Sequence, residues 1–413
     1  MEIVQLIREA ISSFLFKVGM GQAYYIESEL IYVLIAIILF VGIIFFSNKV
    51  GIKFPQGTPQ VTLLIGLVVL FAAIRFQPFG GDAQIYCNYV YMDLFGNNIY
   101  ESTEKYAFNY PPVFLGIIGQ FCKLNYEIYY PILYTILICA IGFFYSREYK
   151  IGLSTTMILL TSSFLGLRWI FKTGNFLIWE LIFLSLALYF SKKNENITLV
   201  LLVLLGLQRL WLLTAVIFWY IIAKEKIDYK GLVGSFSALS ILALIRFDLL
   251  YSYLFQLYGG NTLSSVWNGN ANHNSPSLFL NIVDVFNLHN NFKISLLLYC
   301  LMVLFFIYKN LVNNIFSNKS HILSQTIFLL IVLNPTFKPY LALLATVALF
   351  PLFEIMKKIA LNHFFVLYCL LANLFWIIGS IFPMGYPYSV FQIVFLLSAI
   401  KVINGTNYYI FDD

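Results

Sequence analysis

Long apolar runs separated by short polar segments recur along the whole chain. Runs of this length are typical of helices that cross a lipid bilayer, because about 20 apolar residues span the hydrocarbon core. The pattern predicts spans at residues 31–46, 61–76, 128–145, 152–171, 175–190, 231–247, 294–308, 322–334, 340–356, 364–382 and 388–403. A further apolar stretch, residues 197–223, is interrupted at Gln208 and Arg209, which favours a hairpin of two short helices. We therefore expect an all-α polytopic membrane protein of about 11–13 transmembrane helices, built as one domain.

Composition supports a membrane protein and excludes several other classes. Only 11% of the 413 residues are charged and 61% are hydrophobic, whereas soluble domains carry about a quarter charged residues. The net charge of +6 is spread through short loops, a pattern of membrane topology rather than of a nucleic-acid-binding face. Five scattered cysteines without a CxxC pair predict neither a disulfide framework nor a thiolate metal site. Residues 1–25 are a poor signal peptide, and their helical apolar spacing predicts an interfacial amphipathic helix.

The distribution of lysine and arginine predicts which loops face the cytoplasm. One set of alternate loops holds Lys49, Lys53, Arg147, Lys150, Lys192, Lys193, Lys224, Lys226, Lys230, Lys309, Lys319, Lys357 and Lys358. The opposite loops are longer in total but hold only Lys105, Lys123, Lys172, Arg209, Lys293 and Lys338. The positive-inside rule then places loops 78–126 and 248–292 on the extracytoplasmic side of the plasma (inner) membrane. This assignment requires residues 111–123 to lie along the membrane interface rather than to cross it.

Asp82 is the first candidate for chemistry, because it follows a Gly-Gly pair at the start of the first outer loop. A carboxylate at this position can serve as a general base that accepts the proton of an attacking hydroxyl. The structural alternative is that Asp82 caps a helix over residues 83–95. The two roles are compatible, because a capping carboxylate is also held in position.

Other polar residues fall on the same predicted face, each with a structural alternative. Arg168, Lys172 and Arg209 lie near outer helix ends, where they favour either a phosphate site or contact with lipid headgroups. His273 and His289 lie in the long outer loop without the ordered ligands of a metal site, so they are sugar or phosphate contacts or solvated residues. Lys338 and Tyr340 belong to a turn fixed by prolines. Tyr110-Pro111-Pro112 is typical of an interfacial helix start.

Several of these residues match a known signature. Asp82, Tyr86, the run 94–100 and Tyr110-Pro111-Pro112 resemble the first outer loop of the GT-C class of membrane glycosyltransferases, most closely glycosyltransferase family 87. Members of this family are polyprenol-phosphate-mannose-dependent α-mannosyltransferases. Gly174-Asn175 and the turn from Asn334 to Tyr340 also resemble family segments, although Gln208-Arg209 stands where Lys-Pro is common and the turn lacks a histidine.

The resemblance implies a GT-C fold with juxtamembrane helices in the first outer loop. It implies that Asp82 deprotonates a glycolipid or surface-glycan acceptor, which attacks a polyprenyl-phosphate sugar with inversion. The donor sugar is mannose in the family. Tyr86, Tyr110, His273 and Lys338 are further candidates for substrate binding, and no cofactor or metal is required. The site residues expected from this resemblance to act on the phosphate are Arg168, Lys172 and Arg209, and those expected to orient the sugar are Asn175, Asn270 and Tyr340.

Two other classes of membrane protein remain as alternatives. An O-antigen-type polymerase or ligase also has many spans and a large outer loop, but loop 249–292 carries no arginine of the kind on which such enzymes depend. A flippase or transporter needs charged residues inside its spans and repeats with broken helices. Apart from Glu180, charges near the middle of a predicted span are nearly absent and no internal repeat is visible, so the transferase hypothesis is preferred.

Overall fold

The computed structural model describes an α-helical protein. Its described residues are 81–94, 98–100, 110–112, 115, 119, 122–123, 126–150, 156, 160, 170, 174–175, 177–244, 247–259, 277–312, 318–337 and 340–358. No strand occurs among them. The expected helix 1–25, the spans 31–46, 61–76, 364–382 and 388–403, and most of the span 152–171 lie outside this part of the chain.

The helices follow the order of the apolar runs. Their bounds are α4 Gly81–Leu94, α6 Tyr126–Glu148, α9 Leu177–Phe190, α10 Glu195–Gln208, η1 Leu210–Leu212, α11 Leu213–Ala223, α12 Tyr229–Leu244, α13 Phe247–Gly259, α15 Leu278–Val285, η2 His289–Asn291, α16 Phe292–Val312, α17 Lys319–Val332 and α18 Leu341–Lys358. The helical nature of the predicted segments 128–145, 175–190, 231–247, 294–308, 322–334 and 340–356 is therefore confirmed.

The interruption at Gln208 and Arg209 divides its apolar stretch as predicted. Helix α10 ends at Gln208, and Arg209 adopts an extended backbone with φ −135° and ψ 100°. The chain then passes through the short helix η1 into α11. At the other end of α10, the Asn194 side chain accepts hydrogen bonds from the backbone N–H groups of Asn196 and Ile197 and so caps the helix.

Helix length decides which elements can cross a bilayer unaided. Among the described residues, one helix, His289–Lys309, is long and apolar enough to do so. The segments Leu177–Phe190, Glu195–Gln208, Leu210–Ala223, Lys319–Val332 and Leu341–Leu352 are apolar but shorter. A polytopic arrangement therefore remains a prediction for this α-helical chain.

Helix α17 forms the centre of the bundle, and its polar side chains face inward. Every residue of α17 after Lys319 is buried, including Ser320, Ser324, Gln325 and Thr326. Side chains on the periphery are apolar instead: α16 exposes Ile294, Leu297, Leu298, Leu301, Met302, Phe305 and Tyr308. The interior as a whole is still mainly apolar, so the feature that sets this bundle apart is its exposed apolar periphery.

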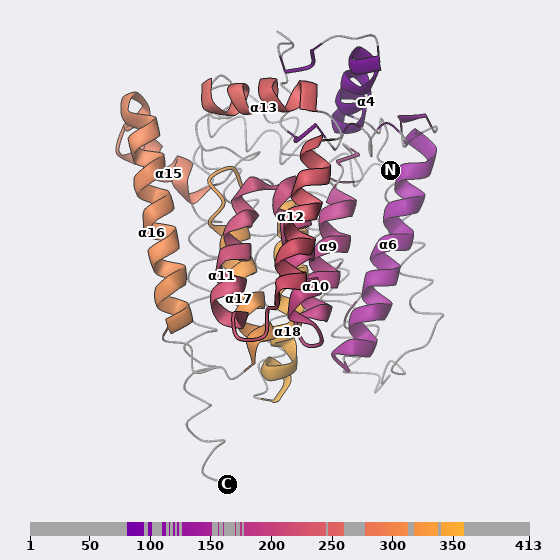
Figure 1. Cartoon of the computed structure of the whole chain (residues 1–413), viewed down its shortest axis with the longest axis vertical. Helices are drawn as coiled ribbons and strands as arrows, with labels where there is room; N and C mark the ends of the chain where they lie inside the picture. The colour runs from indigo at the N-terminus through magenta and orange to yellow at the C-terminus, as the bar shows by residue number, and fades with distance from the viewer. Residues whose placement is uncertain are drawn as a thin grey trace, which may run out of the picture.

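The two ends of the bundle differ in charge and in structure. Helices α6, α9, α12 and α16 run along the long axis, while α13 lies across one end with α4 beside it (Figure 1). At the opposite end, Glu195 lies between Lys226 at 3.7 Å and Lys319 at 3.8 Å, and Lys192 lies over the ring of Tyr149. That end gathers Arg147, Lys150, Lys192, Lys193, Lys224, Lys226, Lys230, Lys309 and Lys319. Among the described residues, the α4 end holds only the cations Lys123, Arg209 and Lys293.

Candidate functional site

Asp82 lies in the first turn of α4, at the end of the bundle that α13 covers. The helix begins at Gly81, one residue before Asp82, so the expectation that Asp82 caps a helix over residues 83–95 is corrected. Glycine accepts a helical backbone at this position, and the helix therefore starts earlier than the Gly-Asp pair suggested. A carboxylate in the first turn still interacts favourably with the positive end of the helix dipole.

Asn175 connects Asp82 to the start of α9. The Asn175 Nδ2 donates a hydrogen bond of 2.9 Å to Asp82 Oδ2, although the two residues are 93 positions apart. Gly174 precedes Asn175 with a φ of 66°, a left-handed conformation that glycine adopts readily. The turn at Gly174 and the start of α9 at Leu177 thus place a 1% exposed amide against the carboxylate.

Arg209 forms a buried ion pair at the break between α10 and η1. Its Nε donates to Glu180 Oε2 at 2.7 Å, and the side chains are only 13% and 2% exposed. The Arg209 Cζ lies 5.0 Å from the centroid of the Tyr340 ring, a geometry that adds a cation–π interaction. Glu180, in the first turn of α9, is a site residue that the sequence analysis did not select; its sequence signal was a charge within an apolar run.

Two tyrosines, Tyr86 and Tyr110, lie on the Asp82 side of the cluster formed by Asp82, Asn175, Glu180 and Arg209. The hydroxyl oxygens of Tyr86 and Tyr110 form a hydrogen bond at 3.2 Å, and their rings meet edge to face at 5.4 Å. The Tyr100 hydroxyl donates to the Tyr110 carbonyl at 2.7 Å and so links these two positions. Burial raises the pKa of Tyr86 and that of Tyr110 above the ordinary tyrosine value. Both phenols therefore remain protonated at neutral pH and keep a hydroxyl for hydrogen bonding.

Charge interactions extend the cluster to Tyr340, next to the start of α18. The Arg209 guanidinium and, more weakly, the Asp82 carboxylate act electrostatically on the Tyr340 hydroxyl. The Asp82 carboxylate also contributes to the raised pKa of Tyr86. The structure thus brings together six of the residues predicted to form the site: Asp82, Tyr86, Tyr110, Asn175, Arg209 and Tyr340.

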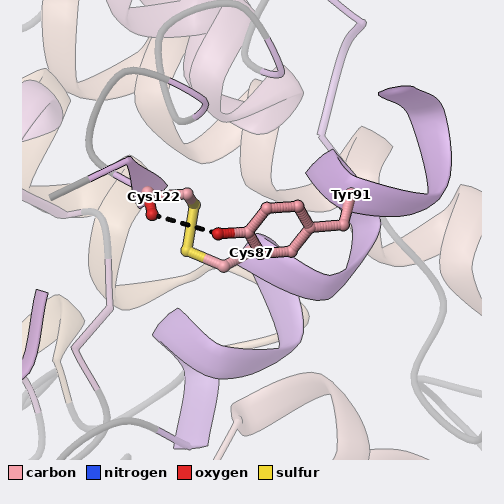
Figure 2. Close-up of a disulfide and its surroundings, with 3 residues drawn as sticks. All are labelled: Cys87, Tyr91 and Cys122. Carbon is pink, nitrogen blue, oxygen red and sulfur yellow. Dashed lines mark hydrogen bonds between the residues drawn. A yellow bond between two sulfur atoms is a disulfide. The ribbon is translucent and has the colours of Figure 1, made fainter. Parts of the chain in front are cut away.

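A disulfide bond fixes α4 beside the site, contrary to the expectation from the cysteine pattern. Cys87 in α4 is bonded to Cys122, with the two Cα atoms 5.4 Å apart, and the Tyr91 hydroxyl donates to the Cys122 carbonyl at 3.3 Å (Figure 2). Sequence spacing alone did not reveal the pair, because the two cysteines are 35 positions apart and only the fold brings them together. Tyr110 and Cys122 both contact α4, so residues 111–122 start and finish at the same end of the bundle.

The remaining predicted site residues have no described placement relative to this cluster. Arg168, Lys172, Asn270, His273 and Lys338 lie outside the described residues. His289 is exposed in η2. In the described part of the chain, no group of three or more His, Cys, Asp or Glu side chains is arranged to hold a metal ion.

The chemistry available at this site is that of a positioned carboxylate among hydrogen-bonding groups. Asp82 is held by an amide and can accept a proton from a hydroxyl group. Arg209, paired with Glu180, presents further N–H donors, and three tyrosine rings supply apolar faces with polar edges. Comparisons with protein family models, with curated proteins and with solved structures each found no match for this chain.

Proposed function

We propose that this protein is an inverting glycosyltransferase of the membrane. It moves a sugar, mannose in the resembled family, from a polyprenyl-phosphate donor to a glycolipid or surface-glycan acceptor. Asp82 is the general base, and the reaction takes place at the extracytoplasmic face of the plasma (inner) membrane. The helices form a GT-C-type bundle in which α4 and the loop after it lie at the membrane surface.

One observation carries this proposal: the convergence of the predicted site residues. Asp82, Asn175, Arg209 and Tyr340 belong to four separate segments of the chain, yet they lie in one connected cluster. Asp82 and Asn175 are joined by a hydrogen bond, the Arg209 Cζ lies 5.0 Å from the Tyr340 ring centroid, and the Asp82 carboxylate acts electrostatically on the Tyr340 hydroxyl. A cluster of buried polar groups at the end of an apolar bundle is expected at a functional site rather than in a purely structural core.

Three further features support a membrane setting with the site on the outer face. The apolar periphery of α16 suits contact with lipid. Cationic residues gather at the end opposite the site, which agrees with a cytoplasmic location of that end under the positive-inside rule. The Cys87–Cys122 disulfide lies at the site end, and disulfides persist in oxidising, extracytoplasmic compartments.

In the proposed reaction, the Asp82 carboxylate accepts the proton of an acceptor hydroxyl while its oxygen attacks the anomeric carbon of the donor sugar. A new carbon–oxygen bond forms, and the bond to the phosphate oxygen breaks, with its electron pair leaving on polyprenyl phosphate. Arg209 contributes N–H donors to that oxygen or to the sugar, while much of its positive charge is balanced by Glu180. We therefore propose that Arg168 and Lys172 also help to neutralise the phosphate.

The proposal is tested by supplying the purified protein in lipid nanodiscs with a polyprenyl-phosphate sugar and a lipid extract as acceptor. The expected result is acceptor-dependent release of polyprenyl phosphate together with an extended glycolipid, identified by mass spectrometry. A flippase or a channel releases no polyprenyl phosphate. The same glycolipid is expected in cells that carry the gene and is absent after its deletion. Unchanged lipid-linked glycans in both measurements contradict the proposal.

A further inference from the structure

Two buried atoms of the site have unused hydrogen-bonding capacity. In the described part of the chain, Asn175 Oδ1 and Arg209 Nη2 are both buried without a hydrogen-bond partner. Such atoms are rare because leaving a buried polar atom unpaired is costly, and each is therefore expected to meet a ligand or an ordered water molecule. One of the atoms is an acceptor and the other is a donor.

The orientation of the Asn175 amide follows from the chemistry of Asp82. An ionised carboxylate only accepts hydrogen bonds, so the NH₂ end of the amide must face Asp82 Oδ2, as its 2.9 Å contact shows. In a planar amide the oxygen is fixed about 2.3 Å from the nitrogen. Asn175 Oδ1 therefore lies within about 5 Å of the carboxylate oxygen and presents an acceptor beside the proposed base.

This arrangement matches two hydroxyl groups on neighbouring carbons of one sugar ring. One hydroxyl approaches Asp82 and loses its proton during the attack. The adjacent hydroxyl reaches Asn175 Oδ1 at an ordinary hydrogen-bond length of about 2.8 Å and donates to it. A molecule with a single hydroxyl uses only the first position.

We infer that Asn175 is a specificity-determining residue that selects an acceptor carrying a free hydroxyl next to the one that reacts. This inference rests on the proposed transferase function and names its acceptor class: a sugar with a vicinal diol at the point of attachment. The reacting hydroxyl still forms the bond to the anomeric carbon, its proton still passes to Asp82, and polyprenyl phosphate is still the leaving group. The neighbouring hydroxyl only positions the acceptor.

The experiment compares two acceptors, the glycolipid extract and water, in the wild-type protein and in the variants Asn175→Ala and Asn175→Ser. Polyprenyl-phosphate mannose is the donor, and transfer to glycolipid and hydrolysis by water are measured in the same nanodisc sample. Water has no adjacent hydroxyl, so the rate of hydrolysis is an internal control that reports whether Asp82 still acts as a base. Size-exclusion chromatography verifies that the variants are folded.

We expect Asn175→Ala to lower the ratio of transfer to hydrolysis about 10- to 100-fold, because an acceptor hydroxyl then loses its partner. Its KM for the glycolipid should rise, and Asn175→Ser should restore part of the ratio. An equal loss of transfer and hydrolysis, or a ratio equal to that of the wild type, overturns the inference and leaves the transferase function intact. Absence of both reactions in the wild-type protein overturns the proposed function itself.

Discussion

The buried pair formed by Glu180 and Arg209 allows a quantitative test of the site's architecture. Arg209→Met keeps an apolar stem of similar length but leaves the 2% exposed carboxyl group of Glu180 without its partner. Breaking a buried ion pair by removal of one partner typically costs about 3–5 kcal/mol of folding free energy. We expect a loss of this size for Arg209→Met and a similar one for Glu180→Gln.

The double variant tests whether the two losses share one cause. If each single substitution is costly because it strands a buried charge, removing both charges together costs less than the sum of the two. The expected coupling free energy is at least about 2 kcal/mol, within the range found for contacting residues. Equilibrium unfolding in mixed SDS and detergent micelles measures all four proteins of the cycle.

The pair formed by Lys226 and Glu195, in which the lysine is exposed and the carboxylate is partly buried, is the control. Its nitrogen and oxygen atoms are 3.7 Å apart, and the Lys226 side chain is 66% exposed. An exposed ion pair contributes about 0–1 kcal/mol because water screens it, so Lys226→Met should change stability little. A loss below about 1 kcal/mol for Arg209→Met, or additive effects in the double variant, refutes the view that Arg209 is held by a desolvated partner.

Three further predictions concern the disulfide and the topology. Replacing both Cys87 and Cys122 by serine should lower the free energy of unfolding by about 4 kcal/mol, because a cross-link between residues 35 positions apart restricts the unfolded chain. The same unfolding assay measures this loss, and unchanged stability contradicts the cross-link. Maleimide-polyethylene glycol should modify these two cysteines only after reduction. With Cys139, Cys300 and Cys369 replaced by serine, an impermeant maleimide should label Lys293→Cys in intact cells and label Lys226→Cys only after permeabilisation. The reverse pattern contradicts an outer-face site.

The sequence predicted local structure well where a single residue pair decided it. The polar pair Gln208-Arg209 within an apolar stretch predicted a break, and α10 and α11 separate there. Asp82 was placed correctly at the start of a helix, but its position within the first turn depended on whether Gly81 joined the helix. Such a difference of one residue follows from glycine's conformational freedom and could not be read from the polarity pattern.

Contacts between distant segments were beyond what the pattern could predict. Glu180 was visible as a charge in an apolar run, but its partner Arg209 lies across a helical hairpin, 29 positions away. The hydrogen bond between Asn175 and Asp82 joins α4 to the residues just before α9, 93 positions further along the chain. The Cys87–Cys122 bond likewise joins positions that are 35 residues apart. Resemblance to a family nominated the residues, and tertiary packing determined which of them meet.

The most direct measurement of the central claim is turnover by Asp82→Asn, compared with Asp93→Asn as a control in the last turn of the same helix. Asparagine preserves the size of the side chain but cannot accept the proton at neutral pH, and general base catalysis contributes about 10²–10⁴-fold to rates. Acceptor-dependent release of polyprenyl phosphate in nanodiscs should therefore fall by at least about 100-fold in Asp82→Asn and remain near the wild-type rate in Asp93→Asn. Turnover by a folded Asp82→Asn protein at the wild-type rate would contradict the account.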